Sequence, residues 1–495
     1  MASSAPAPSW LRVPDDANAL APGVWPEGAH RDAAGRLVVG GVDAETLVRD
    51  FGTPLYVVDE AAARARATRT LAAFEAAAAS VGTTATVYYA GKAFLSGAVV
   101  RWMTEAGLGI DVCTGGELAV ALAAGADPSR IGFHGNNKSP AEIERAVAAG
   151  LGTIVIDSEI EIERVADAAA RAGVVQRVRL RVNSGVHAST HEFLATAHED
   201  QKFGVSLERA VELGERIRSR PSLAFVGLHC HIGSQIFDSA GFAESAERLL
   251  TAHAELSRTA PVPELNLGGG FGIAYTAADD PTPIEQISAG IARAVADGCR
   301  ARGVPLPKLA FEPGRSIIGP AGITLYTVGT IKPVPIDGGV WRHYVSVDGG
   351  MSDNARTALY SADYSARIAS RVSDAEPALV RVAGKHCESG DIVVDAEYLP
   401  HDVGPGDLLA VAATGAYCWS LASNYNHVPR PPVVAVRDGA ARVIVRGETE
   451  SDLLARDAGL DAAAGGPRGA ATSATPTAAV PVHRPTDDDA SGVTA

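Results

Sequence analysis

The sequence has few of the features that mark secreted, membrane-bound or metal-binding proteins. Its five cysteines are scattered over 495 residues without a CxxC spacing, which fits neither a zinc site nor a disulfide framework. No apolar run approaches the length of a membrane span, and residues 1–21 lack a basic start followed by an apolar core. We therefore expect a cytoplasmic protein without membrane contact, in a reducing compartment.

Positive charge is also scarce. Lysine and arginine number 43 against 58 aspartate and glutamate residues, which gives a formal net charge of −15. An acidic chain is a poor partner for nucleic acid or for an anionic membrane surface. Small molecules are the expected ligands.

Two motifs that would indicate other chemistry are missing. No GxGxxG follows an early strand, as a dinucleotide-binding domain would require. His187, His191 and His198 lie close together and make zinc the main rival ligand, but their spacing is not HExxH and no fourth ligand is apparent. We predict that the protein binds no metal.

The two ends of the chain differ in composition from the middle. Residues 458–495 have almost no large apolar side chain to offset the entropy of ordering, so we predict that they are disordered. Residues 1–25, rich in Ala, Ser and Pro, are predicted to form a flexible arm. Residues 26–54 are expected to contribute strands to a second domain, since the chain is long enough for two cores.

Short β-rich apolar runs alternate with helical patterns through the middle of the chain. Eight such units in succession favour a closed (β/α)8 barrel, over residues 55–320, rather than an open doubly wound sheet. The eight predicted strands are Thr86–Ala90, Leu108–Cys113, Ile131–His134, Thr153–Asp157, Val178–Asn183, Phe225–His231, Glu264–Leu267 and Leu309–Glu312.

After Arg315 the pattern changes to strands with few helices. The fold class is therefore α/β plus β: a TIM-like barrel followed by a mainly β domain, a sandwich or small barrel, over residues 321–457. The strands predicted there are Ile323–Ile331, His343–Asp348, Ala378–Ala383, Leu408–Ala413 and a hairpin over Val433–Val445.

Polar residues follow the predicted barrel strands. Each could be an ordinary cap or turn residue, but a barrel builds its active site at the carboxyl ends of its strands, so a whole rim of them indicates a site. The rim consists of Lys92, Asp111, His134, Asp157, Asn183, His231, Gly268–Gly270 and Glu312.

Four features of this rim together fit pyridoxal 5'-phosphate. Lys92 ends a strand without charged neighbours in sequence and, in mostly apolar surroundings, offers an amine for a Schiff base. Glu312 can keep a heterocyclic nitrogen protonated, and His231 can stack on the ring. The glycines Gly268–Gly270 allow backbone N–H groups to approach a phosphate.

Motifs spread from about Gly52 to Asp457 resemble those of the diaminopimelate decarboxylases. This family belongs to the barrel-fold, or fold-type III, pyridoxal-phosphate decarboxylases, which also include ornithine and arginine decarboxylases. The matching motifs are Tyr89-Ala-Gly-Lys92-Ala-Phe, Phe133-His-Gly-Asn-Asn-Lys138, Lys202-Phe-Gly204, His229-Cys-His-Ile-Gly-Ser-Gln235, Leu267-Gly-Gly-Gly-Phe-Gly272, Glu312-Pro-Gly-Arg315, Asp348-Gly-Gly350, Cys387-Glu-Ser-Gly-Asp391 and Arg446-Gly-Glu-Thr449.

The resemblance implies a homodimer that converts meso-2,6-diaminopimelate to L-lysine and carbon dioxide. It implies that Lys92, His231, Glu312 and the proton donor Cys387 are catalytic, and that Cys387 and Glu388 reach the site from the second subunit. The cofactor-binding residues that it implies are Lys92, His231, Ser234, Gly268, Gly269, Gly270, Glu312, Gly314, Arg315 and Tyr417. The substrate-binding residues are Arg315, Arg356, Tyr360, Glu388 and Tyr417.

The charged side chains fit the same substrate. A distal ammonium group needs only an acid, here Glu388, whereas arginine is suited to a distal carboxylate. Arg356 and Tyr360 therefore carry the distinction from the alternatives, which are a related decarboxylase of ornithine or arginine and a barrel-fold racemase. A non-catalytic regulator that binds the cofactor is the other alternative, and the completeness of the site favours an enzyme.

Overall fold

The computed structural model describes residues 7–186, 202–336 and 339–461. They form a large unit that ends at Glu448 and a short one that begins at Thr449 and holds α12 (Glu450–Leu454) and α13 (Ala458–Asp461). The disorder predicted for residues 458–495 is wrong at its start, because Ala458–Asp461 form α13, and residues 462–495 lie outside the described residues. The three histidines weighed as zinc ligands, His187, His191 and His198, also lie outside them.

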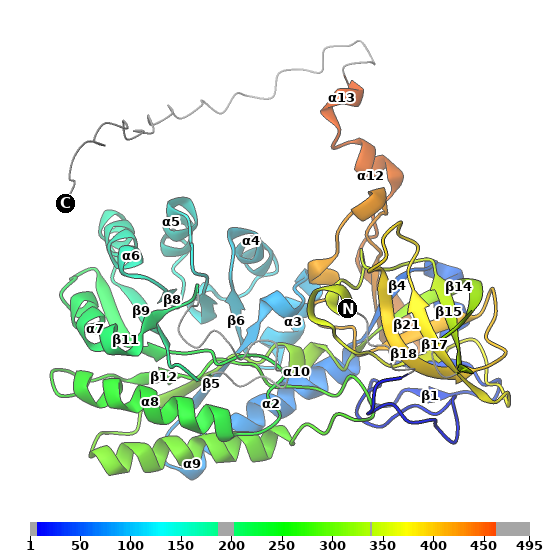
Figure 1. The fold of residues 1–495 in the computed structure, drawn as a ribbon. Coiled ribbons are helices and arrows are strands. Elements are labelled where there is room, and N and C mark those ends of the chain that lie inside the picture. Colours follow the sequence, from blue (N-terminus) through cyan, green and yellow to red (C-terminus); the bar gives the residue numbers. More distant parts are fainter. Residues whose placement is uncertain (1–6, 187–201, 337–338, 462–495) are drawn as a thin grey trace, which may run out of the picture. The chain divides into compact units, whose positions relative to one another are not determined.

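Eight parallel strands close into a barrel, as predicted (Figure 1). Each strand pairs with its neighbours in the ring, and the ring closes where β8 pairs with β9 and β13 pairs with β5. The short β10 (Val205–Ser206) adds to β9 outside this ring. The eight strands are β5 (Ala85–Ala90), β6 (Gly109–Val112), β7 (Ile131–Phe133), β8 (Thr153–Ile156), β9 (Gln176–Asn183), β11 (Leu223–His229), β12 (Glu264–Asn266) and β13 (Lys308–Phe311).

Helices surround these strands (Figure 1). Polar N-cap side chains start several of them: Asp59 caps α2, and Ser139 forms a capping box with Glu142 at α5. No helix in the described ranges is long and apolar enough to cross a membrane. The helices are α2 (Glu60–Ser80), α3 (Gly97–Glu105), α4 (Gly115–Ala123), α5 (Pro140–Ala148), α6 (Glu159–Ala172), α7 (Ala210–Arg218), α8 (Ala240–Leu256) and α9 (Ile284–Arg302).

The second sheet is mainly antiparallel and joins distant parts of the sequence. Its central strand β4 (Leu55–Asp59) pairs with β14 on one side and β20 on the other, so residues 55–59 belong to this sheet and not to the barrel. Two of its strands, β16 and β18, lie in segments without a predicted strand. The other strands are β14 (Gly322–Pro335), β15 (Trp341–Val347), β16 (Ala366–Ile368), β17 (Pro377–Ala383), β18 (Ile392–Pro400), β19 (Leu408–Ala412), β20 (Val433–Arg437) and β21 (Ala440–Val445).

The N-terminal segment packs against the β domain. Strands β1 (His30–Arg31), β2 (Leu37–Val39) and β3 (Val42–Asp43) form a three-stranded sheet of their own, followed by α1 (Ala44–Phe51). The Leu37 amide donates to the Ala369 carbonyl at 2.8 Å, which ties this small sheet to the β domain without joining its main sheet. The prediction of a flexible arm over residues 1–25 is wrong for its last part, because Ala17, Val24 and Trp25 are buried. Trp25 and Val24 fill a second apolar core.

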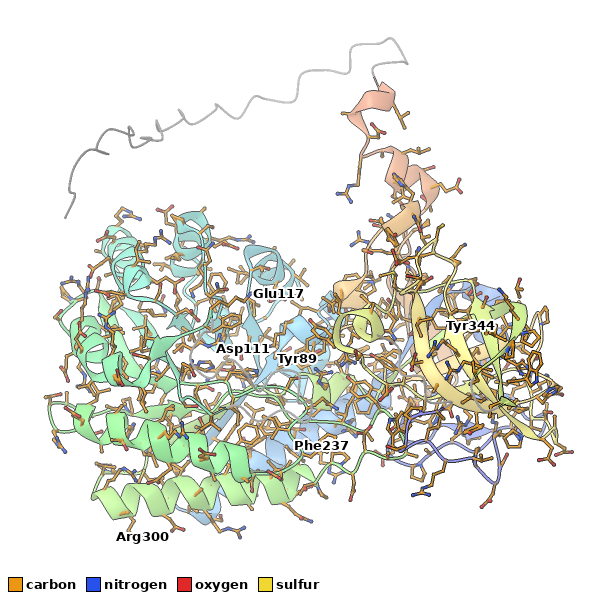
Figure 2. The ribbon with its side chains drawn as sticks, viewed as in Figure 1. Tyr89, Asp111, Glu117, Phe237, Arg300 and Tyr344 are labelled. Carbon is orange, nitrogen blue, oxygen red and sulfur yellow. The ribbon has the colours of Figure 1, made fainter. Side chains whose placement is uncertain are left out.

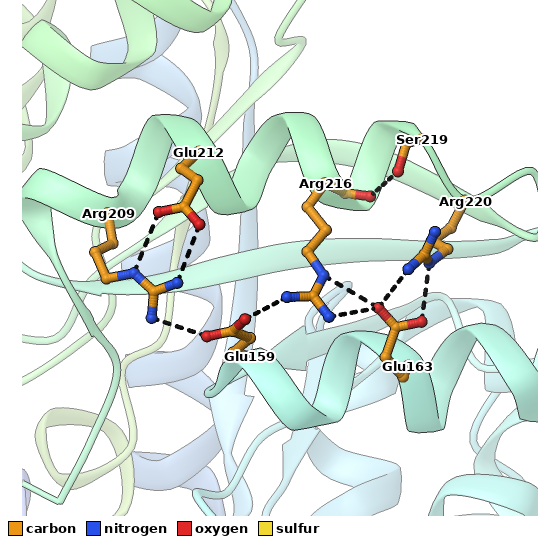
Figure 3. A network of polar contacts seen from close by, with 7 residues as sticks. All are labelled: Glu159, Glu163, Arg209, Glu212, Arg216, Ser219 and Arg220. Atoms are coloured by element: carbon orange, nitrogen blue, oxygen red, sulfur yellow. Dashed lines mark hydrogen bonds and ion pairs between the residues drawn. The ribbon is translucent and has the colours of Figure 1, made fainter.

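A network of charged side chains joins α6 to α7 on the outside of the barrel (Figure 3). Arg216 of α7 is its centre: its guanidinium bonds Glu159 and lies 2.9 Å from Glu163 of α6. Glu163 also pairs with Arg220, at an N–O distance of 2.7 Å, and Glu159 also pairs with Arg209, at 2.9 Å. Because each acid is shared by two arginines, the network fixes several long side chains at once and holds the two helices together.

Candidate active site

The polar residues predicted for the rim do lie at the carboxyl ends of the barrel strands. Asp111 is the penultimate residue of β6, and His134 and Glu312 directly follow β7 and β13. All three are buried, with at most 9% of their surface exposed. Figure 2 places Asp111 inside the ring of helices, whereas Arg300 lies on the outer side of α9. The strand ends therefore bring these titratable groups into one interior region.

Lys92 follows β5 in a short 3₁₀ turn, Gly91–Ala93. Its side chain is exposed, and its charge acts on Asp111, Glu117 and His231. The predicted apolar surroundings are therefore wrong, because β6, helix α4 and the segment after β11 contribute Asp111, Glu117 and His231. The amine is accessible to a ligand, and several ionisable groups surround it.

Glu312 is the most closely surrounded acid of the site. Asn266 at the end of β12 donates to it at 2.7 Å, and His229 Nε2 lies 3.2 Å from the carboxylate. His134 Nε2 lies 3.4 Å from Glu312 Oε1 and 3.2 Å from Asp111. Burial alone would raise the pKa of Glu312, but His134 and His229 hold it well below its usual value. This carboxylate is therefore ionised, as a partner for a protonated ring nitrogen must be.

The triple glycine after β12 passes very close to neighbouring backbone. A Cβ on Gly268 would lie 2.4 Å from the Cys230 carbonyl oxygen, and one on Gly269 would lie 2.1 Å from the Glu312 carbonyl oxygen. Gly268 and Gly270 also have positive φ, of 67° and 110°. The Gly269 amide donates to His231 Nδ1 at 3.3 Å, so the loop and this ring lie against each other.

Arg315 and Tyr417 join the barrel to the β domain. Arg315 donates to Ser234 Oγ at 2.8 Å and to the Tyr275 hydroxyl, and its guanidinium lies 4.6 Å from the centre of the Tyr417 ring. The Tyr417 amide donates to the Ala93 carbonyl at 2.7 Å, next to Lys92. These contacts bring four predicted cofactor residues, Lys92, Ser234, Arg315 and Tyr417, into connected positions. Gly314 also fits here, with the Ala90 oxygen 2.9 Å from where its Cβ would be.

Arg356 is buried, with 5% of its surface exposed, and lies beside two tyrosines that the sequence did not single out. It donates to the Tyr364 hydroxyl at 2.5 Å, and its guanidinium lies 4.7 Å from the centre of the Tyr275 ring. Tyr275 thus contacts both Arg315 and Arg356. In the sequence, Tyr275 could have been noticed because it lies shortly after the glycine-rich turn. Its contact with Arg356 depends on the tertiary fold and could not be predicted.

Cys387 and Glu388 lie in an exposed loop of the β domain. The Cys387 amide donates to Asn426 Oδ1 at 3.3 Å, and Tyr425 donates to Glu388 at 3.4 Å. Tyr360, at the end of α11 (Arg356–Tyr360), is also exposed, by 58%. Within one chain these three predicted substrate and proton-donor residues therefore face solvent.

The residues of the barrel mouth fit pyridoxal phosphate. Lys92 offers an accessible amine and Glu312 a buried, ionised carboxylate. His231 offers a ring beside the glycine loop, and a phosphate can be bound by Arg315 and Ser234. His134, His229 and Glu312 also place one ligand atom each within 4.8 Å of one another, a geometry that a metal ion could use. The amine and the glycine loop have no part in such a metal site, whereas pyridoxal phosphate has a chemical group that suits each of the four features.

Comparisons with known proteins agree with this chemistry. The family model for the pyridoxal-binding domain of pyridoxal-dependent decarboxylases matches residues 67–319. The diaminopimelate decarboxylase of Mycobacterium tuberculosis is 52% identical over 443 residues, 88% of this chain and 98% of the relative, and that of Bacillus subtilis is 46% identical over 87% and 97%. A crystal structure of diaminopimelate decarboxylase from M. jannaschii with L-lysine has a TM-score of 0.81 at 31% identity, covering 87% of this chain and 98% of that one. The chain therefore belongs to the diaminopimelate decarboxylase family of pyridoxal-dependent enzymes.

Proposed function

We propose that this protein removes one carboxylate of meso-2,6-diaminopimelate as carbon dioxide and leaves L-lysine. In the reaction, the bond between one α-carbon and its carboxyl carbon breaks, and a proton takes the place of the carboxylate. When bound, pyridoxal phosphate supplies an aldehyde for the substrate amine and a ring that accepts the electron pair left by carbon dioxide. The chain has to bind both ends of the substrate and deliver that proton.

Arg356 is the observation that carries the choice of substrate. Its guanidinium is buried, and among the described residues it has only neutral contacts, the Tyr364 hydroxyl and the Tyr275 ring. A buried cation without an anion is costly, so a carboxylate arriving there would gain a strong paired interaction. Diaminopimelate carries such a distal carboxylate, whereas ornithine and arginine do not.

The remaining residues divide the work between binding and proton transfer. We propose that the amine of Lys92 binds the cofactor covalently. Its phosphate group is bound by Ser234, Gly268–Gly270 and Arg315. Glu312 pairs with the ring nitrogen, and His231 covers the ring face. Tyr417 lies over Arg315 and closes this side of the site.

We propose that Cys387 and Glu388 act in the site of a second subunit, with Cys387 as the proton donor and Glu388 as the partner of the distal ammonium. Their exposure in one chain supports this arrangement, as does the exposure of Leu359, Tyr360 and Tyr425 nearby in the β domain, by 60%, 58% and 39%. Exposed large apolar side chains of this kind mark surfaces that a partner covers.

We further propose that the reaction takes place in the cytoplasm. All five cysteines are free thiols, which fits a reducing compartment. Fractionation of cells followed by activity measurement in each fraction tests this placement, and activity confined to an exported fraction would contradict it.

The direct test is to supply meso-diaminopimelate, ornithine and arginine in parallel to the purified protein with pyridoxal phosphate, while released carbon dioxide is measured. Only diaminopimelate should release carbon dioxide at a substantial rate. Preference for ornithine or arginine would overturn the substrate assignment. Release from none of the three would favour a non-catalytic protein.

Arg356→Ala should lower kcat/KM for diaminopimelate on the order of 10²-fold or more while leaving cofactor binding unchanged, because the distal carboxylate loses its only buried cation. Arg356→Lys should recover part of this loss, since it keeps the charge without the two-pronged guanidinium. An unchanged kcat/KM in Arg356→Ala would show that the distal carboxylate binds elsewhere.

A further inference from the structure

The carboxylate of Glu312 is held by side chains from two neighbouring strands. Asn266 at the end of β12 donates to Oε1 at 2.7 Å, and His229 at the end of β11 approaches with Nε2 at 3.2 Å. Asn266 is 0% exposed and His229 is 1% exposed. A hydrogen bond from a fixed, buried donor determines which way a carboxylate points, and such supporting residues tune the group they hold.

The geometry fixes which nitrogen of His229 carries the proton. Burial lowers the pKa of His229 to about 4, so the ring is neutral at physiological pH. An ionised carboxylate can only accept hydrogen bonds, and a neutral imidazole has a single N–H. Because Nε2 faces Glu312, and Nδ1 is buried without a hydrogen-bond partner among the described residues, the proton lies on Nε2.

Asp111 and His134 complete the electrostatic surroundings. Burial and the nearby Glu312 raise the pKa of Asp111 well above its usual value, so ionisation of this acid is disfavoured beside Glu312. His134, whose Nε2 is 3.2 Å from Asp111, is neutral, because burial lowers its pKa to about 4. Of the two acids, Glu312 is therefore the one whose surroundings favour the ionised form.

We infer that His229 is a positioning residue for the reaction: its Nε2–H holds the Glu312 carboxylate ionised and aimed at the site of the cofactor ring nitrogen. This inference rests on the proposed role of Glu312. A carboxylate that is free to rotate, or that takes up a proton, no longer keeps the ring nitrogen protonated, and the ring then accepts electrons less well. Asn266 donates to Oε1 only, whereas His229 Nε2 lies 3.2 Å from Oε2 and so restrains the second oxygen of the carboxylate.

The choice of substitution separates this role from simple packing. His229→Leu removes the donor and keeps most of the volume. His229→Gln places an amide nitrogen near the position of Nε2, whereas His229→Asn places one near the position of Nδ1. If His229 acts through Nε2, the His229→Gln variant should retain the function of His229 and the His229→Asn variant should not. His253, another buried histidine with an unpartnered Nδ1 but located on α8 away from the site, gives a matched control as His253→Leu.

The experiment measures the absorption spectrum of the bound cofactor against pH, the cofactor dissociation constant by fluorescence titration of the cofactor-free protein, and kcat and KM. His229→Leu and His229→Asn should shift the spectrum and its pH dependence, and should lower kcat at least tenfold with KM within about twofold of wild type. His229→Gln should recover most of kcat, and His253→Leu should match wild type in spectrum and kcat.

Equal spectra and kcat in the Gln and Asn variants, or a wild-type spectrum in the Leu variant, would overturn the inference. The Gln and Asn comparison decides the matter even if the Leu variant fails to fold. A wild-type protein that binds the cofactor without decarboxylating diaminopimelate would refute the proposed function instead, and the spectra and dissociation constants of the variants would still test the role of His229.

Discussion

At the scale of single residues, the accessible amine of Lys92 leads to a direct prediction. Lys92→Ala should abolish the visible absorption band of lysine-bound cofactor and reduce turnover severely, while circular dichroism stays unchanged, because the side chain is exposed at the barrel mouth and packs no core. Lys308→Ala, an exposed lysine at the opposite end of a barrel strand, is the control and should keep both band and activity. Turnover near the wild-type rate in Lys92→Ala would remove the amine from the mechanism.

A second residue, Asp353, predicts a pH dependence of stability. It is buried beside Tyr326 and accepts from the Gly350 amide at 2.8 Å, and burial raises its pKa to about 7 from its usual value of 3.8. A raised pKa means that the folded protein holds a proton that the unfolded chain has released. The stabilisation is complete below about pH 3.8 and is lost as the pH rises through about 7.

The melting temperature of the wild type should therefore fall between pH 6 and pH 8, and that of Asp353→Asn should fall less, because an amide cannot ionise. The amide can still accept from Gly350 and donate to the Tyr326 hydroxyl. Parallel melting curves for the two proteins across this pH range would show that another group titrates.

The residues that carry the chemistry of the site could be predicted from the sequence better than the residues that contact them. Lys92, His231 and Glu312 follow strands that periodicity reveals, so their place on one rim could be predicted. Tyr275 and Tyr364, by contrast, contact Arg356 only because a barrel loop meets the β domain. His229 was visible in its motif, but its hydrogen bond to Glu312, 83 residues further on, arises from the closure of the barrel. The surroundings of Lys92 were mispredicted for the same reason.

At the scale of elements, all eight barrel strands could be predicted, because buried parallel strands are short apolar runs between helical patterns. The β domain was harder. Strand β18 (Ile392–Pro400) has two acidic residues among its apolar ones and so lacks a continuous apolar run, and β16 has only three residues. The pairing of β4 with β14 and β20 joins segments far apart in sequence, and no local pattern reports it.

The charged network between α6 and α7 gives a prediction at this scale (Figure 3). Arg216→Met should lower the melting temperature by on the order of 1–2 °C at low salt, since it removes the side chain that joins Glu159 to Glu163. The loss should shrink in 0.5 M sodium chloride, because salt screens exposed charges. Arg300→Met, which breaks one isolated pair with Asp297, is the control and should change little. A loss that does not depend on salt would point to packing.

At the scale of the whole molecule, the proposal that two subunits share each site can be tested by complementation. A dimer of one Lys92→Ala chain and one Cys387→Ala chain would hold both lesions in one site and leave the other intact. Mixing the two inactive variants under conditions of subunit exchange should restore about one quarter of wild-type activity, because half of the dimers are mixed and each has one intact site. Mixed dimers that remain inactive would show that each site is complete within one chain.

The position of β4 also has a consequence for synthesis of the protein on the ribosome. Residues 55–59 are made early, yet their partners in the sheet begin at Gly322 and Val433. All eight barrel strands lie between them in sequence, so the barrel can close while β4 still waits for β14. At typical elongation rates the delay is on the order of 10–50 s, and for that time Leu55, Tyr56 and Val57, all buried in the finished protein, have no strand to pair with. The nascent chain thus exposes an unpaired apolar strand at the stage when chaperones bind.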